Sequence, residues 1–239
     1  MAVILVGTFA FAKIIMEKNA KNRLGGDIEV SRIGLPGALS LQAYLGIHGK
    51  VRSESKSVKI EAKAHAKDAA GEIKPVTAII KSIDRKYPLY SKWEFTDKKR
   101  RNIFGHFAKG TIRGAVVTKS LLSELGIEVG EHFLIGDKMF VATAILTKEP
   151  DAPSDDNAPR MLVSTKGFFE MLNVNRQYDH KVIYSYRIKL PNNADTAEWK
   201  TNFKNVFGGD NWQVRSWQEM RPPLSPAQNG LLFLLLFWP

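Results

Sequence analysis

The sequence contains no cysteine. A disulfide framework and a thiolate metal site are therefore excluded. Cysteine usage does not distinguish an oxidising from a reducing compartment for this chain. The chain also lacks the phosphate-binding pattern GxxxxGK[ST], a strand-linked GxGxxG and the nucleophile elbow GxSxG. These absences argue against ATP hydrolysis by this chain. They also leave a secreted hydrolase, the remaining enzyme alternative, without a supporting motif.

Metal-binding patterns are missing as well. The five histidines are scattered, without HExxH or a close pair, and each is interpreted as a surface or strand histidine. The acidic stretch from Asp151 to Asn157 superficially resembles a calcium loop, but it lacks the glycine and the terminal glutamate of an EF-hand. We therefore expect a solvated loop over residues 151–159, and no catalytic residue, metal or cofactor.

Positive charge is the main electrostatic feature, with a formal net charge of +11. Such an excess suits nucleic acid, an anionic membrane surface or an acidic partner protein. The basic run at 98–101 has aromatic neighbours such as Trp93 and Phe104, which single-strand binders use for stacking. No RRM, KH or helix-turn-helix pattern accompanies it, so no nucleic acid is expected. A basic, surface-attached module for anionic membrane or nucleic acid stays the alternative function.

Two apolar, uncharged stretches lie at the ends, residues 2–12 and 230–238. A spanning helix needs about 20 apolar residues, so each is interpreted as part of a membrane helix. A signal peptide is the alternative at the N-terminus, but no Lys or Arg precedes the stretch and no clear cleavage site follows it. A core element of a soluble protein is the third interpretation.

Residues 8–24 favour a helix with a Glu17–Lys21 pair, and Gly25 ends it. Residues 28–31 then alternate as a half-buried strand does. Further strands are expected at 58–64, 76–80, 114–118, 133–135, 139–142, 161–163, 182–190 and 212–216, and further helices at 37–48, 119–125, 166–172 and 194–206.

This order of elements predicts an α+β fold. A β-α-β-β unit comes first, a strand-rich middle follows, and a β-α-β unit closes the chain. We expect the outer segments, 26–84 and 179–220, to pack together around an inserted subdomain.

A set of short motifs carries a further signal: Leu24–Ile28, Lys81–Asp84 before Tyr87–Tyr90, Leu125–Gly130 before Ile135–Asp137, Glu149–Asp151 and Ala158–Met161. In their order and spacing, over about residues 9–220, they resemble the permease subunits of ABC transporters of the FtsX/MacB type, in particular the YbbP-like branch. The positions carried over as structural markers are Gly25, Gly26, Asp27, Tyr87, Pro88, Leu89, Tyr90, Gly136, Asp137, Glu149, Pro150, Asp151, Pro159 and Arg160.

The resemblance implies a MacB-like periplasmic core domain. Its porter-like α/β subdomain would comprise 25–94 and 166–221, and its inserted strand-rich subdomain would comprise 95–165. A partial transmembrane helix with a juxtamembrane stalk would precede it at 1–24. A truncated apolar segment would follow at 222–239.

The same resemblance implies a function. The chain is expected to sit in the inner membrane with its main domain in the periplasm, as part of a truncated permease. The implied partners are a separate ABC ATPase subunit, membrane lipids and a periplasmic partner protein. ATP-driven motion would pass through the helices to this domain, which would act on lipidic or hydrophobic substrates or on partner proteins.

Overall fold

The computed structural model describes residues 2–34, 38–47, 50–67, 71, 73–96, 102–109, 112–152, 157–172, 181–208 and 211–220. The helices are α1 (Ala2–Leu24), α2 (Ala38–Ile47), α3 (Lys119–Leu125), α4 (Thr165–Leu172) and α5 (Thr196–Phe207), with short 3₁₀ turns η1 (Ile103–His106) and η3 (Trp217–Met220). The strands are β1 (Ile28–Ile33), β2 (Ser53–Lys67), β3 (Ile73–Ile83), β4 (Glu94–Phe95), β5 (Ala108–Lys109), β6 (Ile112–Thr118), β7 (His132–Ile135), β8 (Lys138–Lys148), β9 (Arg160–Val163), β10 (Ile183–Lys189) and β11 (Gln213–Ser216). All the predicted helices and strands are present, some with shifted ends.

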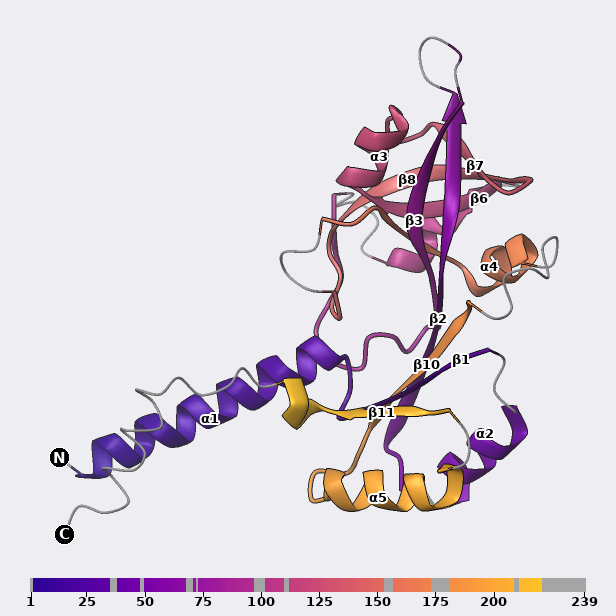
Figure 1. The fold of residues 1–239 in the computed structure, drawn as a ribbon. Helices are drawn as coiled ribbons and strands as arrows, with labels where there is room; N and C mark the ends of the chain where they lie inside the picture. The colour runs from indigo at the N-terminus through magenta and orange to yellow at the C-terminus, as the bar shows by residue number, and fades with distance from the viewer. Residues whose placement is uncertain are drawn as a thin grey trace.

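A long antiparallel hairpin, β2–β3, runs through the molecule (Figure 1). The first half of β2 pairs with β10, while Ala64 and His65 near its other end pair with β7. β3 pairs in parallel with β9 over Ile79–Ser82. The described strands therefore belong to one sheet, and its main path runs β11-β1-β10-β2-β3-β9-β6-β8-β4.

One end of the hairpin carries what we call the lower lobe, made of β1, β10, β11, α2 and α5. Here β1 lies between β10 and β11, and both pairings are antiparallel. Helices α2 and α5 cover one face of these strands, where Tyr44 meets Phe203 edge-on at 5.6 Å between ring centroids. The predicted contact between the outer segments is therefore present, and the subdomain boundaries stay a prediction.

The other end carries the upper lobe, made of β6–β9, α3 and α4. Its core contains Phe133, Phe140 and Phe168, all almost fully buried, together with apolar residues of the β2–β3 hairpin. Helix α3 begins where the Thr118 side chain accepts a hydrogen bond from the Leu121 amide, and it ends at Gly126 in the left-handed conformation. The strand predicted at 114–118 and the helix predicted at 119–125 are thus both present.

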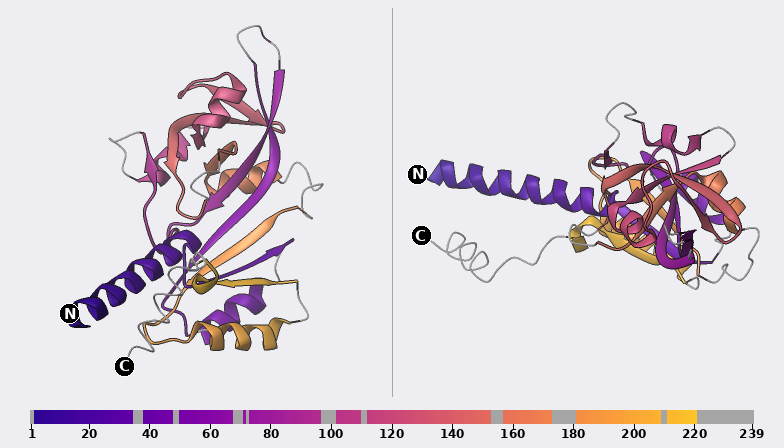
Figure 2. Two further views of the ribbon diagram at one scale, coloured as in Figure 1. Left: turned by 60° about the vertical axis from the view of Figure 1, so that its left-hand side comes forward. Right: turned by 90° about the horizontal axis from the view of Figure 1, so that it is seen from above.

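Helix α1 projects away from both lobes in all views (Figures 1 and 2). Its C-terminal turns pack against the domain, with Ala20 and Leu24 buried against Trp217. Farther out, Phe11 and Ile14 are more than 60% exposed. No helix in the described part of the chain combines the length and the apolarity that crossing a membrane requires. The apolar stretch 230–238 lies outside the described residues.

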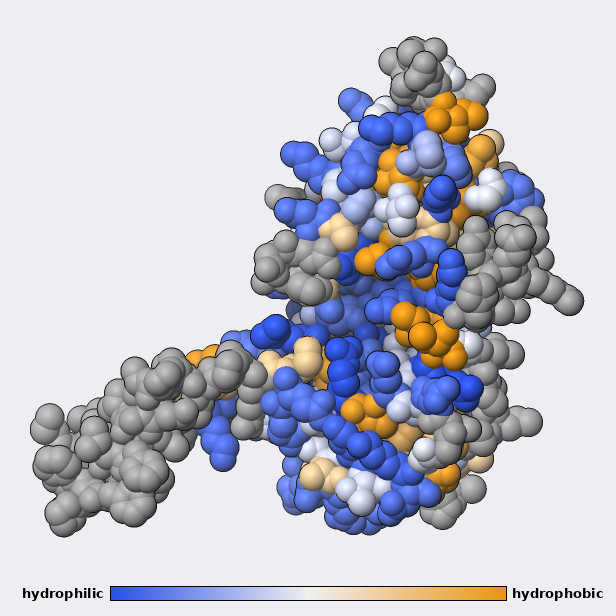
Figure 3. Space-filling model, in the orientation of Figure 1, coloured by the Kyte–Doolittle hydropathy of each residue, from blue (hydrophilic) through white to orange (hydrophobic). Residues whose placement is uncertain are grey.

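The face seen in Figure 3 is mainly hydrophilic, with apolar residues in separate spots. Charged side chains are nevertheless found inside the protein as well, and they gather where α1, the hairpin and both lobes meet. This meeting point is the candidate site.

Candidate functional site

Glu29 on β1 is flanked in register by two arginines. It faces Arg187 on β10 and Arg215 on β11. Arg187 Nη2 donates to Glu29 Oε1 at 3.2 Å, and Arg215 Nε donates to Oε2 at 3.0 Å. The Glu29 side chain is only 4% exposed. The prediction of a half-buried strand is therefore wrong, because cross-strand arginines cover and neutralise the polar face of β1.

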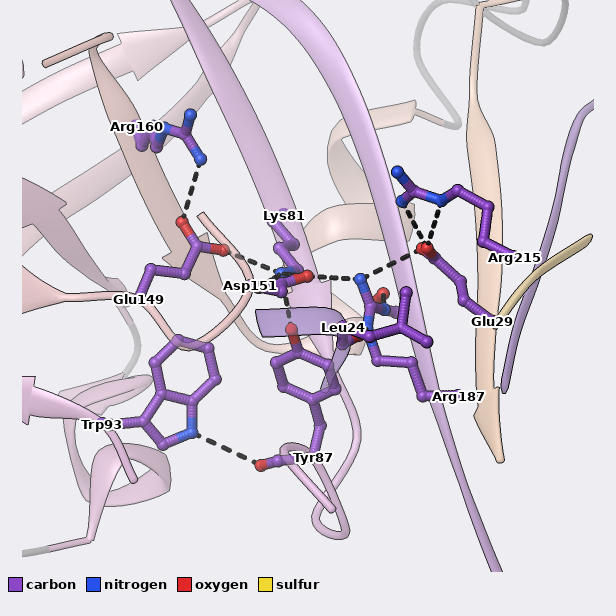
Figure 4. A network of polar contacts seen from close by, with 11 residues as sticks. Leu24, Glu29, Lys81, Tyr87, Trp93, Glu149, Asp151, Arg160, Arg187 and Arg215 are labelled. Atoms are coloured by element: carbon purple, nitrogen blue, oxygen red, sulfur yellow. Dashed lines mark hydrogen bonds and ion pairs between the residues drawn. The ribbon is translucent and has the colours of Figure 1, made fainter. Parts of the chain in front are cut away.

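Asp151 lies between two cations (Figure 4). Its Oδ1 accepts a hydrogen bond from Lys81 Nζ at 2.6 Å, and its Oδ2 forms an ion pair with Arg187. Burial alone would raise the pKa of the Asp151 carboxyl, but the charges of Arg187 and Lys81 hold that pKa well below its ordinary value. The prediction of a solvated loop is wrong for Asp151, because two buried cations replace water around its carboxylate.

Lys81 on β3 is the counterpart of Asp151. Its Nζ atom also donates to Glu149 Oε1 at 2.7 Å and to the Tyr87 hydroxyl at 3.0 Å, and it lies 4.6 Å from the centroid of the Tyr87 ring. Burial acts to lower the pKa of Lys81, but the attraction of Asp151 and Glu149 outweighs it and raises that pKa. Burial also raises the pKa of Tyr87, so its hydroxyl stays protonated.

Arg187 connects this cluster to α1. Its Nε atom donates to the main-chain carbonyl of Leu24, and its Nη1 atom donates to Ser57 Oγ on β2 at 2.7 Å. The guanidinium lies 4.8 Å from the Tyr87 ring centroid. Gly25, with φ of +76°, passes so close that an added Cβ would lie 2.9 Å from Arg187 Cδ. One side chain thus contacts α1, the hairpin and the segment after β8.

Asp27 forms a second, smaller anchor beneath α1. Its Oδ2 accepts hydrogen bonds from the Tyr90 hydroxyl and the Leu190 amide, both at 2.9 Å. Lys21 Nζ lies 3.1 Å from Oδ1, and the predicted Glu17–Lys21 pair is present at 2.7 Å. Burial and the Asp27 charge raise the pKa of Tyr90. The turn after α1 is therefore fixed by side chains as well as by its glycines.

Arg160, the last of the marker positions, extends the network to β9. Its Nη1 atom donates to Glu149 Oε2 at 3.3 Å, and its main-chain amide donates to Thr118 Oγ1 at 2.9 Å. The neighbouring Pro159 carbonyl accepts a hydrogen bond from the Ile79 amide at 2.9 Å. Through these contacts the segment after β8 is tied to the upper lobe.

Most of the marker positions predicted from sequence thus lie in or beside one buried network. The contributing side chains and the close-packed glycine are Asp27, Tyr87, Tyr90, Glu149, Asp151, Arg160 and Gly25, and the flanking positions are Gly26, Pro88, Leu89, Pro150 and Pro159. Gly136 and Asp137 instead form the β7–β8 turn, where Asp137 pairs with Lys138.

Sequence reasoning missed Glu29 and Arg187, and it included Lys81 only within a motif. The three residues lie in strands whose alternating pattern indicates a solvent-facing charge, and their partners are distant in the chain. The interpretation of His106 as a surface or strand histidine is also wrong. His106 is buried in η1, where its ring meets Phe95 edge-on at 5.0 Å.

The charged groups of the network are paired with one another. Each of its carboxylates, Glu29, Glu149 and Asp151, contacts at least one cation. Within the described residues, no group of three or more His, Asp or Glu side chains is arranged to hold a metal. His48, His180 and the basic run 98–101 lie outside those residues. A saturated, buried set of ion pairs is suited to fixing the relative position of elements.

No family model matches the sequence, and no curated protein matches it either. Solved structures do. The periplasmic region of MacB from Actinobacillus actinomycetemcomitans superposes with a TM-score of 0.52 at 9% identity, over 84% of this chain and 93% of that one.

Two further structures match less well. The extracellular domain of the ABC-type transporter YknZ from Gram-positive bacteria gives a TM-score of 0.46 at 15% identity, over 79% and 99% of the two chains. A permease domain from Porphyromonas gingivalis gives a TM-score of 0.46 at 9% identity, over 80% of this chain and 89% of that one. The YbbP-like branch stays a prediction. The MacB superposition confirms the predicted fold class: the chain has the α+β fold of the MacB periplasmic region.

Proposed function

We propose that this chain is the extracytoplasmic domain of an ABC-transporter permease subunit of the FtsX/MacB type. Helix α1 is then the membrane-proximal end of an anchoring helix, and both lobes lie in the periplasm above the inner membrane. The shared fold with the MacB periplasmic region supports the assignment. The exposed apolar side chains of Phe11, Ile14 and Ile15 on the projecting helix support the direction of the anchor.

The observation that carries the mechanism is the attachment of α1 to the buried network. Arg187 holds the end of the helix through Leu24, and it holds the segment after β8 through Asp151. The end of α1 is therefore joined to buried ion pairs that connect both lobes. These ion pairs resist a displacement of α1 relative to the lobes. On this basis, motion generated outside this domain reaches both lobes together. The domain transmits it to lipidic or hydrophobic substrates, or to a periplasmic partner protein.

The energy source in this proposal is a separate ABC ATPase subunit. The absence of a phosphate-binding loop from these 239 residues agrees with it. We expect the purified chain to have no ATPase activity. An adjacent reading frame for such an ATPase, and a continuation of this gene that encodes more membrane helices, would agree with the proposal.

The absence of cysteine gives a direct test of location. Single cysteines replace exposed residues of the two lobes, Met139→Cys on β8 and Val206→Cys on α5. Ala115→Cys, at a fully buried position, is the matched control. We expect a membrane-impermeant maleimide to label the two exposed positions in intact cells, and to label Ala115→Cys only after denaturation. Labelling of Met139→Cys and Val206→Cys only after cell lysis would place the domain in the cytoplasm and reject the proposal.

A further inference from the structure

A large cleft lies between the C-terminal half of α1 and the upper lobe. Its volume is about 1340 Å³. Helix α1 lines one wall, while α3, the end of β8 and the segment after it line the other. Ligand pockets for small molecules occupy roughly 300–1,000 Å³, so this cleft has room for a larger molecule.

Part of the lining is apolar. Met16 and Ala20 contribute from α1, Ile145 from β8 and Met220 from η3. Methionine side chains are unbranched and adapt to irregular shapes, which suits a flexible hydrocarbon chain. The apolar part of the cleft begins beside the exposed apolar turns of α1.

The rest of the lining is polar and carries unbalanced positive charge. The two carboxylates among the described lining residues already have partners: Glu94 is paired with Lys148 at 3.1 Å, and Glu149 is paired with Arg160 at 3.3 Å. Arg23 on α1 and Lys119 on α3 are exposed in the same lining, and neither forms an ion pair within the described part of the chain.

Hydroxyl and amide groups lie around these two cations. They come from both walls and from the neighbouring strands, and they can donate hydrogen bonds to an oxygen-rich anion. They include Asn19 and Asn22 on α1, Ser120 and Ser123 on α3, and Thr147 on β8. Arginine, lysine and hydroxyl donors are the usual partners of a phosphate group.

We infer that this cleft binds an anionic phospholipid, with the phosphate head between Arg23 and Lys119 and the first part of an acyl chain on Met16 and Met220. The inference rests on the proposed function, because α1 has to enter the membrane for the cleft to lie beside a lipid surface. The inference names a ligand, an anionic phospholipid, and its binding site. The similarity of fold alone gives neither.

Photocrosslinking tests the site in the full chain. The chain is reconstituted into phosphatidylcholine vesicles that contain a minor fraction of photoactivatable phosphatidylglycerol. We expect crosslinks on the segments 119–123 and 145–148, which line the cleft on the wall opposite α1. The double variant Arg23→Gln/Lys119→Gln should reduce these crosslinks by about tenfold, because two charge-assisted hydrogen bonds to phosphate are lost.

The matched control removes the same charge elsewhere. Lys63→Gln/Lys74→Gln changes two exposed lysines of the β2–β3 hairpin and should leave the crosslinks unchanged. Equal urea midpoints of the two double variants establish that both are folded. Excess unlabelled phosphatidylglycerol should compete, and inorganic phosphate at the same concentration should not.

Three outcomes would overturn the inference. The crosslinks could be confined to α1, they could survive Arg23→Gln/Lys119→Gln, or inorganic phosphate could displace the lipid as well as phosphatidylglycerol does. Failure of the proposed function is a separate result, since it appears as maleimide labelling of Met139→Cys only after lysis and does not depend on these crosslinks.

Discussion

The Nε atom of Arg187 donates a hydrogen bond of 3.1 Å to the main-chain carbonyl of Leu24, the last residue of α1. The last carbonyls of a helix have no partner inside the helix, so a buried helix end needs a donor from elsewhere. Arg187 supplies it and adds a positive charge at the negative end of the helix dipole. The attachment of α1 is therefore part of the fold of the domain.

Replacing Arg187 by methionine should destabilise the protein strongly. The Arg187→Met variant leaves Asp151 buried with Lys81 as its remaining cation and removes one of two partners of Glu29. Removing one partner of a buried ion pair lowers the free energy of unfolding by about 3–5 kcal/mol. Urea unfolding measures the change. Arg215→Met is the matched control: its side chain is 52% exposed, so we expect a loss of at most about 1 kcal/mol. Equal losses in the two variants would contradict the central position of Arg187.

The stability should depend on acid pH through Asp151. Its pKa is lower in the folded state than its ordinary value of 3.8. The unfolded chain therefore takes up the proton first as the pH falls, and the stabilising contribution is lost. We expect the difference in unfolding free energy between the native chain and Asp151→Asn to be constant above about pH 5. It should shrink below pH 3.8 as the pH falls toward the folded pKa. A difference that stays constant down to pH 2 would contradict the ion pairs with Lys81 and Arg187.

Gly25→Ala should be more damaging than the same change at another glycine with positive φ. At Gly25, with φ of +76°, the new Cβ would meet Arg187 Cδ at 2.9 Å. At Gly71, with φ of +81°, no atom of the described residues lies within 4 Å of the added Cβ. Both substitutions share the backbone strain of about 1 kcal/mol, so the difference isolates the contact with Arg187. Urea midpoints that fall equally would show that the arginine moves aside freely.

Truncation should separate the packed part of α1 from its projecting part. A chain trimmed to residues 17–224 keeps Ala20, Leu24 and their contact with Trp217. We expect it to be a soluble, cooperatively folding monomer by size-exclusion chromatography, because the exposed apolar residues Phe11, Ile14 and Ile15 are gone.

Trimming to 25–224 should lower the unfolding free energy by about 2 kcal/mol or more, because burial of Leu24 and its contact with Arg187 are lost. If the 17–224 chain unfolds while the intact chain is soluble without detergent, the outer turns of α1 belong to the core. The membrane interpretation would then fall.

The elements of this fold could be predicted because their signals are local. The glycine after Leu24 and the alternation along β2 each lie within a few residues of the structure they determine. The network could not be predicted in the same way. Glu29 and Arg187 are 158 residues apart, and Lys81 and Glu149 are 68 apart. A charged residue in an alternating strand indicates a solvent-facing side chain unless its distant partner is known.

The position of β1 between β10 and β11 has a consequence for synthesis. Both neighbours of β1 are made late, since roughly 150 residues separate Ile33 from Ile183. At typical translation rates this interval lasts roughly 10–30 s, and Ile28 and Val30 have no strand to pair with during it. The nascent lower lobe therefore stays open until the chain is almost complete. Slower translation would lengthen the time for which these two apolar strand residues lack their partners.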